Sequence, residues 1–307
     1  MTLNWSLSRK HDTLAARAAI INEIRMFFIE GGYLEVETPL LIPAPAPESH
    51  IDAMPVDSRY LQTSPEICMK RMLAAGFERI FQLRHCWRSD ERGGLHLPEF
   101  TMLEWYRSNS DYMNLMEDCE SLVQNVARAR GLGDRIVFKG MSIELRSPWE
   151  RISVSDAFRR YGGLSMEQAL KQDLFDEVMV NEIEPRLGLD KPVFIYDYPA
   201  ERGALARLKE KDPSLAERFE LYIGGLELAN AFSELTDHLE QRDRFLEEQE
   251  SRRSKGKTVY ALPEKFLAEL PAMPPSAGIA LGIDRLVMVL LDKSSIDEVV
   301  AFTPEEL

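Results

Sequence analysis

Apolar residues recur every three or four positions along residues 12–30, which is the spacing of one face of an α-helix. The residues on that face are Leu14, Ala18, Ile21, Ile24 and Phe28. Gly31 and Gly32 end the predicted helix, and residues 33–39 are expected to be extended. A second helix is predicted to begin within Thr63-Ser-Pro-Glu66, where a hydroxyl can cap the helix and proline suits the first turn.

Two β-hairpins are predicted farther along the chain. Residues 80–89 and 99–107 are rich in strand-forming side chains and flank a polar, glycine-containing loop, so they are expected to pair in antiparallel fashion. The second hairpin covers residues 218–234 and turns at Gly224 and Gly225, the residue pair that a two-residue hairpin turn favours.

The remaining segments complete the predicted fold. Residues 111–190 are more charged and mostly helix-like, so they are expected to be helical connections or a small insertion. A strand is predicted at residues 193–196, a charged helix at 239–255, and a strand, a glycine-spaced turn and an apolar helix over 278–291. Paired strands with helices at their edges predict one α+β domain over residues 1–307, with an antiparallel sheet flanked by helices.

Composition narrows the class of protein. The chain has 307 residues, of which 45% are hydrophobic and 29% charged, as in globular proteins with a sizeable core. No apolar stretch approaches the roughly 20 residues of a membrane span, and no secretory signal precedes residue 10, so a cytoplasmic protein without a membrane segment is expected. The three cysteines form no CxxC pair, which argues against a zinc site. A net charge of −14 argues against a large nucleic-acid footprint.

Candidate chemistry begins in the first hairpin. Alternate residues of a strand share a face. Arg84 and Arg88 therefore lie on one face of the first predicted strand, and Glu104 and Tyr106 lie on one face of the second. An arginine there suits a phosphate oxygen, since its planar group donates two charge-assisted hydrogen bonds. The alternative is an ordinary surface salt bridge between Arg88 and Glu104.

The second hairpin carries two carboxylates. The turn pairs Tyr222 with Glu227 and makes Glu220 a diagonal neighbour of Glu227. Mg²⁺ on a triphosphate would relieve their repulsion, because Mg²⁺ takes one or two carboxylates plus phosphate oxygens. The alternative is a solvated face. Strict alternation puts Asn230 and Glu234 on the opposite face, so a shared site requires a bulge near Ala229.

The segment of residues 277–285 has small residues at positions 278, 280 and 282, which let a ligand approach the backbone. Arg285 begins the following helix, whose N-terminus favours an anion. Glu66, at the start of the predicted second helix, is free to bind an ammonium group even though its neighbours cap that helix.

These segments, in this order, resemble the catalytic core of class II aminoacyl-tRNA synthetases, and within it the lysyl subgroup. Gly31–Leu41 is similar to the first motif, a dimer-interface helix and strand. The stretches 81–88 and 98–106 resemble the second motif, and 278–285 resembles the third. Glu227-Leu-Ala-Asn-Ala-Phe-Ser-Glu-Leu-Thr-Asp237 is close to the lysyl-specific signature.

The resemblance implies a role for each matching residue. Arg88 and Arg285 would be catalytic and hold the α- and γ-phosphates of ATP, while Glu220 and Glu227 would hold Mg²⁺. The other implied ATP contacts are Ser89, Asp90, His96, Leu97, Glu227, Leu228 and Gly282. The implied contacts to a lysine-like amino acid are Ser64, Pro65, Glu66, Glu104, Tyr106, Asn230, Glu234 and Ala280. Among them, Glu66 would bind the α- or β-amino group, and Glu104, Tyr106 and Glu234 the side-chain ammonium.

Two features select the subfamily. The chain is expected to lack the OB-fold anticodon-binding domain of tRNA-charging enzymes, and Ala280 stands where those enzymes have glycine. Both features resemble the ligases that attach (R)-β-lysine to a lysine of elongation factor P. A methyl group in a tight pocket discriminates between substrates by roughly 1–3 kcal/mol. The resemblance thus implies ATP, Mg²⁺, elongation factor P and a homodimer, and makes tRNA an unlikely acceptor.

Four positions depart from the family pattern: Ser89 replaces asparagine, Asp90 replaces glutamate, Leu97 replaces asparagine and Ala231 replaces glycine. Two other interpretations therefore remain beside the protein ligase. One is an enzyme that charges tRNA or only forms lysyl-adenylate, which charging of tRNA without elongation factor P would support. The other is a non-catalytic regulatory protein, which ATP binding without pyrophosphate chemistry would support.

Overall fold

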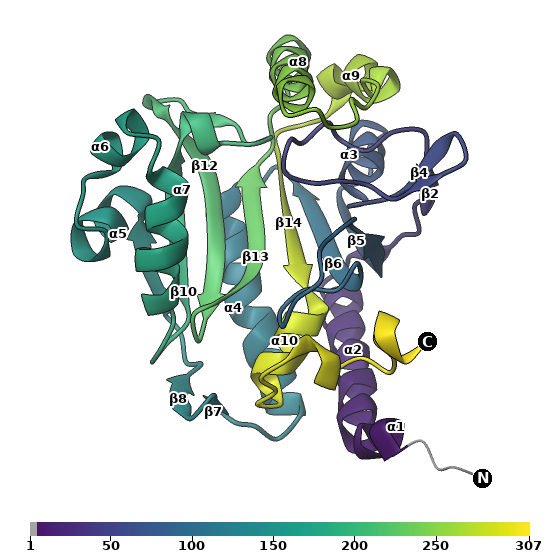
Figure 1. The fold of residues 1–307 in the computed structure, drawn as a ribbon, viewed down its shortest axis with the longest axis vertical. Coiled ribbons are helices and arrows are strands. Elements are labelled where there is room, and N and C mark those ends of the chain that lie inside the picture. Colours follow the sequence, from purple (N-terminus) through teal and green to yellow (C-terminus); the bar gives the residue numbers. More distant parts are fainter. Residues whose placement is uncertain (1–4) are drawn as a thin grey trace.

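A nine-stranded mixed sheet forms the centre of the computed structural model, which describes residues 5–307 (Figure 1). The strand order along the sheet is β1-β5-β6-β14-β13-β12-β10-β9, and β11 pairs with β12. Their bounds are β1 Leu34–Glu35, β5 Arg79–Trp87, β6 Glu99–Ser108, β9 Glu150–Ser153, β10 Val193–Pro199, β11 Leu208–Lys209, β12 Asp212–Ile223, β13 Leu226–Ser233 and β14 Ser276–Gly282. Both predicted hairpins are confirmed, as β5–β6 and β12–β13.

The predicted fold class is confirmed, but the sheet is mixed rather than purely antiparallel, because the pairs at its two edges are parallel. β1 pairs with β5 in parallel, and β9 pairs with β10 in parallel. Both edge strands are short, two and four residues, so neither produces a clear alternating pattern in the sequence. The central six strands are antiparallel, as predicted.

One face of the sheet is covered by two long helices, α2 His11–Glu30 and α4 Tyr112–Ala129 (Figure 1). On the face toward these helices, Leu103 and Trp105 of β6 and Ala277, Ile279 and Leu281 of β14 are buried in the main core. Phe28 of α2 stacks on Phe81 of β5 with ring centroids 4.9 Å apart. The even-numbered residues of the same strands therefore lie on the opposite face, and that face is available for a site.

The segment predicted to be helical, residues 111–190, contains more than helices. Besides α4, it holds the hairpin β7 Arg135–Phe138 and β8 Met141–Glu144, and the edge strand β9. Its short helices are α5 Val154–Tyr161, α6 Met166–Lys171 and α7 Phe175–Val178, followed by a π-helical turn, Met179–Ile183, and a 3₁₀ turn, Glu184–Arg186. Their apolar residues form a satellite core with Val193 and Tyr198 of β10.

Five other helices lie within residues 5–307. They are the short α1 Trp5–Arg9, α3 Glu66–Ala74, α8 His238–Ser254, α9 Glu264–Glu269 and α10 Ile283–Leu290. Four 3₁₀ turns cover Ala200–Arg202, Leu270–Ala272, Ile296–Glu298 and Pro304–Glu306. A small sheet pairs β2 Leu41–Ile42 and β3 Pro55–Val56 with β4 Arg59–Leu61. Among the helices of residues 5–307, none has the length and apolar character needed to cross a bilayer.

The start of α10 differs from the sequence prediction in one respect. The glycine-spaced segment forms strand β14 rather than a turn, and Gly282 is the last residue of that strand. Asp284, in the first turn of α10, accepts a hydrogen bond from the backbone N–H of Thr101 (2.8 Å) and pairs with Arg17 of α2 at 2.5 Å. The helix is thereby fixed against β6 and α2, which sets the position of Arg285.

Candidate active site

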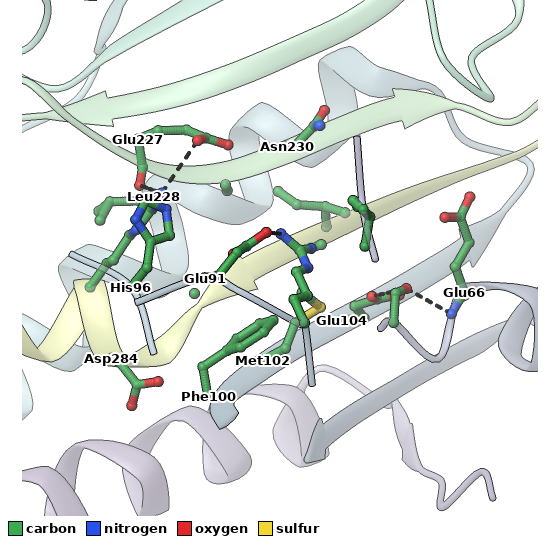
Figure 2. Close-up of a pocket in the computed structure, with 18 of the residues that line it drawn as sticks. Glu66, Glu91, His96, Phe100, Met102, Glu104, Glu227, Leu228, Asn230 and Asp284 are labelled. Atoms are coloured by element: carbon green, nitrogen blue, oxygen red, sulfur yellow. Dashed lines mark hydrogen bonds and ion pairs between the residues drawn. The ribbon is translucent and has the colours of Figure 1, made fainter. Parts of the chain in front are cut away.

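The free face of β6, β14 and β13 forms the floor of a cavity of about 300 Å³. Register places Ala280 of β14 between Asn230 of β13 and Glu104 of β6. The cavity is elongated: Glu66 and Glu104 lie at one end, and Glu227 and His96 lie at the other (Figure 2). One end is therefore acidic, while Arg88 and Arg285 line the cavity as cations.

A β-bulge gives β13 the geometry that the site requires. Tyr222 pairs with Glu227, but the next residue of β12, Leu221, pairs with Ala229, so Leu228 is the extra residue. Glu220 then pairs with Asn230, which brings Asn230 to the same face as Glu227. The bulge predicted near Ala229 is confirmed, one residue earlier in the chain. The turn glycines, Gly224 and Gly225, have φ of 63° and 72°, as a primed hairpin turn requires.

The acidic end is built from β6 and the start of α3. Glu104 is almost fully buried and accepts hydrogen bonds from the hydroxyls of Ser64 (2.6 Å) and Tyr106 (2.7 Å). Burial, and then the charge of Glu66, raise the pKa of Glu104 to about 7. Ser64 Oγ also accepts from the backbone N–H of Glu66, the first residue of α3, at 3.0 Å, so the predicted helix start within residues 63–66 is confirmed, with Pro65 as the N-cap residue.

Behind this end lies a cation that the sequence analysis did not assign to the site. Lys70, fully buried one helical turn after Glu66, places its Nζ 2.5 Å from Glu66 Oε1 and 2.5 Å from Glu234 Oε2. The two carboxylates raise the pKa of Lys70 above its usual range, so it is a permanent cation. Burial raises the pKa of Glu234 to about 8. Two carboxylates, Glu66 and Glu234, thus share one buried ammonium group.

Gly278 is required by this packing. A Cβ at that position would lie 2.2 Å from Cε1 of Tyr106 and 2.3 Å from Oε1 of Glu234. By contrast, a Cβ at Gly282 would meet only the side chain of Arg285, at 3.8 Å. The space over Gly282 is therefore open to a ligand, whereas the space over Gly278 is filled by the protein.

Arg88 follows β5 and enters the cavity from its rim. Its guanidinium lies over the ring of Phe100, 5.1 Å from the centroid, and 3.9 Å from Glu91. No ion pair joins it to Glu104 within residues 5–307, so the simple salt bridge weighed in the sequence analysis is absent there. Asp90 is exposed with φ of 61°, and Glu91 rather than Asp90 lines the cavity.

Arg285 closes the far end. Its Nη1 donates to the backbone carbonyl of Glu227 at 2.8 Å and lies 3.3 Å from Glu227 Oε2. Its Nη2 donates to Nε2 of His96. Partial burial and the neighbouring Arg285 lower the pKa of His96, so the imidazole is neutral and accepts this hydrogen bond.

The two carboxylates predicted to hold Mg²⁺ lie in neighbouring strands, with a third one near them. Glu220 is buried and accepts hydrogen bonds from Tyr198 (2.7 Å), Tyr222 (2.8 Å) and Arg218 (2.6 Å). Burial, and then the charges of Glu220 and Glu227, raise the pKa of Glu184 to about 7. Burial and Glu220 likewise raise the pKa of Glu227.

The structure brings most of the predicted residues to one cavity. Its lining includes Ser64, Glu66, Arg88, His96, Leu97, Glu104, Tyr106, Glu227, Leu228, Asn230, Ala280, Gly282 and Arg285. Pro65, Ser89, Asp90, Glu220 and Glu234 are not among its lining residues. Four residues at or beside the site are not predicted from the sequence: Glu48, Lys70, Glu91 and Glu184. Only Lys70 had a local signal, its i,i+4 spacing from Glu66.

The departures from the family pattern have structural explanations in two cases. Ala231 is fully buried on the face opposite Asn230 and belongs to the main core. Leu97 is 4% exposed and also joins that core while it lines the cavity. Neither side chain adds a charged or hydrogen-bonding group to the site.

The chain matches the family model of class II tRNA synthetases (D, K and N) over residues 2–306. It is 39% identical to the elongation factor P–(R)-β-lysine ligase of Actinobacillus succinogenes, over 97% of each chain. It is 39% identical to the ligase of the same name from Hamiltonella defensa and 38% identical to that of Avibacterium paragallinarum, over 98% of each chain in both cases. The protein therefore belongs to the class II tRNA synthetase family and, within it, to the elongation factor P–(R)-β-lysine ligases.

Proposed function

We propose that this enzyme activates (R)-β-lysine with ATP as an aminoacyl-adenylate and transfers the aminoacyl group to a lysine of elongation factor P. The observation that carries the proposal is a single cavity with a carboxylate-lined end, Glu66 and Glu104, and two arginines, Arg88 and Arg285. An amino acid with two ammonium groups fits the acidic end, and a polyphosphate fits the arginines. The names of the relatives supply the amino acid and its acceptor.

The first half-reaction is displacement at the α-phosphorus. The carboxylate of the amino acid attacks that phosphorus, the bond to the β-phosphate oxygen breaks, and pyrophosphate leaves. Arg88 and Arg285 would neutralise the phosphate charge, and Asn230 would orient the attacking carboxylate. The protein would thus contribute positioning and electrostatic stabilisation, without covalent catalysis.

Glu220 and Glu227 are the residues that would hold Mg²⁺. Carboxylates suit this ion, and burial together with mutual repulsion raises the pKa of Glu184 and Glu227, although Arg218 and Arg285 pair with Glu220 and Glu227. Among residues 5–307 no three acidic, histidine or cysteine side chains converge as a complete metal cage, so phosphate oxygens and water would supply the other ligands. The ion would offset charge on the phosphates.

Ala280 is the proposed selector between α- and β-lysine. It lies in register between Asn230 and Glu104, which would contact opposite ends of the amino acid. Its methyl group would narrow the cavity where an α-amino group projects, at a cost of roughly 1–3 kcal/mol to the wrong isomer.

The net charge, the exposed apolar residues and the proposed substrates bear on the acceptor, the subunit interface and the location of the enzyme. The acidic chain, with a net charge of −14, favours a protein acceptor over tRNA. A homodimer would form through α2 and β1, where Ile29 and Leu34 expose apolar side chains at the open edge of the sheet. Because ATP and a translation factor are its proposed substrates, we place the enzyme in the cytoplasm.

Amino-acid-dependent ATP–pyrophosphate exchange tests the activation step, with (R)-β-lysine, α-lysine and no amino acid compared. Exchange that prefers (R)-β-lysine, followed by a covalent mass increase on elongation factor P, is the expected result. Preference for α-lysine with charging of tRNA would replace the proposal with a tRNA-type enzyme. Absence of exchange with either amino acid would remove the activation step altogether.

A further inference from the structure

A second cavity, of about 270 Å³, adjoins the acidic end of the first. Its walls come from the proline-rich loop, α3 and α9, and they are mostly apolar. Lining side chains of this kind include Ile42, Pro43, Pro45, Ile67, Leu262 and Phe266. Three residues line both cavities: Glu48, Ser64 and Glu66. A long aliphatic chain with a charged end matches such a space, because apolar walls lead to carboxylates.

Hydrogen bonds to the backbone of its loop fix the position of Glu48 where the two cavities meet. The fully buried Arg252 of α8 donates to the carbonyls of Glu48 (2.7 Å) and Ile51 (2.9 Å), and pairs with Asp52 at 2.5 Å. The backbone N–H of Ser49 donates to Glu248 at 2.6 Å. The loop is therefore anchored to α8 on both sides of Glu48.

The carboxylate of Glu48, in contrast, is unengaged. Within residues 5–307 it accepts no hydrogen bond from a protein donor and has no cationic partner within 4.0 Å. The charged groups that face it are Glu66 and Lys70 of α3, Glu248 of α8, and Arg88. A polar group that is partly buried without a partner is costly, so a ligand that donates to it is expected.

In the proposed function, Glu48 would lie beside the reacting bond of the adenylate. In the proposed function, Glu66 binds the amino group nearest the carboxyl carbon, and Arg88 binds the α-phosphate on its other side. Both residues line the first cavity and both lie within electrostatic reach of Glu48. The acyl carbon would lie between the amino group and the phosphate, so Glu48 would be near the atom that the acceptor amine attacks.

We propose that the second cavity admits the side chain of the acceptor lysine and that Glu48 is the general base that removes a proton from its ammonium group. This inference rests on the proposed transfer to a lysine. An ammonium group has no lone pair, so it must lose a proton before it becomes a nucleophile. The apolar walls would hold the aliphatic chain, and Glu48 would accept the proton at the inner end.

The transfer of the aminoacyl group to the acceptor lysine conserves atoms and charge. One proton passes from the acceptor ammonium to the Glu48 carboxylate, and the neutral amine attacks the acyl carbon to form a C–N bond. The C–O bond of the mixed anhydride breaks, and its electron pair leaves with AMP. The nitrogen then loses its second proton to solvent, and Glu48 returns its own proton to solvent.

The acidity of Glu48 suits this role. Burial, and then the charge of Glu66, raise its pKa to about 7. A base with a pKa near the working pH combines proton affinity with a substantial ionised fraction. Below about pH 7 Glu48 is increasingly protonated, so the transfer rate is expected to fall there even when the adenylate is already formed.

The test compares two nucleophiles on the same preformed adenylate, in single turnover. Elongation factor P presents a lysine ammonium, whereas hydroxylamine is neutral near pH 7 and needs no base before it attacks. Glu48→Gln is expected to lower the ratio of lysine transfer to hydroxamate formation by about 10²–10⁴-fold and to remove the acidic limb of the transfer rate against pH. A wild-type ratio and pH profile in Glu48→Gln would overturn the role of Glu48.

A second pair of variants tests the cavity independently of Glu48. Ala44→Phe fills the second cavity, and Ala44 does not line the first. It is expected to lower the same ratio by about tenfold or more, while Val137→Phe, at an exposed position of β7, keeps the wild-type ratio. An unchanged ratio in Ala44→Phe would overturn the lysine channel. A wild-type enzyme that forms adenylate but modifies no lysine of elongation factor P would instead contradict the proposed function itself.

Discussion

Lys70 places its ammonium nitrogen 2.5 Å from Glu234 Oε2, and neither side chain is exposed to solvent. The same nitrogen lies 2.5 Å from Glu66 Oε1, and it sits 5.0 Å from the ring centroid of Phe232. Glu234 therefore already has a cationic partner from the protein. Its effect on a substrate ammonium would be exerted partly through Lys70, which fixes Glu66 at the cavity wall.

Replacing Lys70 by methionine is expected to destabilise the fold. The substitution keeps an unbranched side chain, one atom shorter, but leaves two carboxylates without their cation in a buried site. Loss of one partner of a buried ion pair costs about 3–5 kcal/mol, which urea unfolding would measure. The double variant Lys70→Met with Glu234→Gln is the control, and it should recover much of that loss. Equal stability of Lys70→Met and wild type would contradict the buried-pair interpretation.

The affinity for the amino acid is expected to depend on pH. Glu104 and Glu234, with pKa raised to about 7 and about 8, must be ionised to attract ammonium groups, and they titrate together. KM for (R)-β-lysine in the exchange assay should therefore rise as pH falls below about 7, approaching tenfold per pH unit. Glu104→Gln should give a higher KM with a flatter pH dependence. A wild-type KM that is constant between about pH 5.5 and 8 would refute the assignment.

The raised pKa of Glu104 also predicts how the stability of the unliganded protein changes with pH. The pKa of Glu104 is raised from 4.5 to about 7, so between these values the folded state keeps a proton that the unfolded state releases. The free energy of unfolding attributable to Glu104 should therefore decrease as pH rises from about 4.5 to 7. Glu104→Gln should lack this component, which urea unfolding at both pH values would measure.

Two glycines of β14 should respond differently to alanine. Gly278→Ala would force a methyl group into Tyr106 and Glu234, and such overpacking costs about 1–3 kcal/mol or more of stability. Gly282→Ala meets only the Arg285 side chain at 3.8 Å, so it should keep wild-type stability. Its KM for ATP should instead rise about tenfold, because the methyl group occupies the proposed nucleotide space. Equal melting temperatures of the two variants would contradict this distinction.

The sequence predicts those parts of the site in which the alternation of a strand determines the face on which each residue lies. Glu220 and Glu227 were expected to be neighbours because the two-glycine turn fixes the register of their hairpin. A bulge was expected because Glu227 and Asn230 otherwise point to opposite faces. The fold class was predictable for the same reason, since the central strands are long enough to show their alternation.

The unpredicted part depends on contacts between distant segments. Glu48 is placed by Arg252, which is 204 residues away, so nothing near it in the sequence indicates its position. The backbone conformation after β5 exposes Asp90 and leaves Glu91 to line the cavity, a choice that strand alternation does not determine. The parallel edge strand β9 was missed because its four residues lie among short helices.

Glu227→Gln is expected to impair activation and its dependence on Mg²⁺. The substitution removes a charge that would hold the ion and that lies 3.3 Å from Nη1 of Arg285. Pyrophosphate exchange should fall by about 10²–10³-fold, and chelation with EDTA should abolish wild-type exchange until Mg²⁺ is restored. Glu217→Gln, whose carboxylate pairs with Arg207, is the matched control and should leave exchange nearly unchanged. Wild-type exchange by Glu227→Gln would rule out its proposed role.

The open edge of the sheet is where a second copy of the chain would pack. Leu34 of the edge strand β1 is 52% exposed, and Ile29 of the adjoining α2 is 51% exposed. Leu34→Glu puts a charge on this apolar edge and should convert the proposed dimer to a monomer, as measured by light scattering at micromolar concentration. Val180→Glu is the control, because Val180 is similarly exposed, at 57%, but lies in the turn after α7, away from β1. A monomeric wild type, or a dimeric Leu34→Glu, would show that this edge does not form the subunit interface.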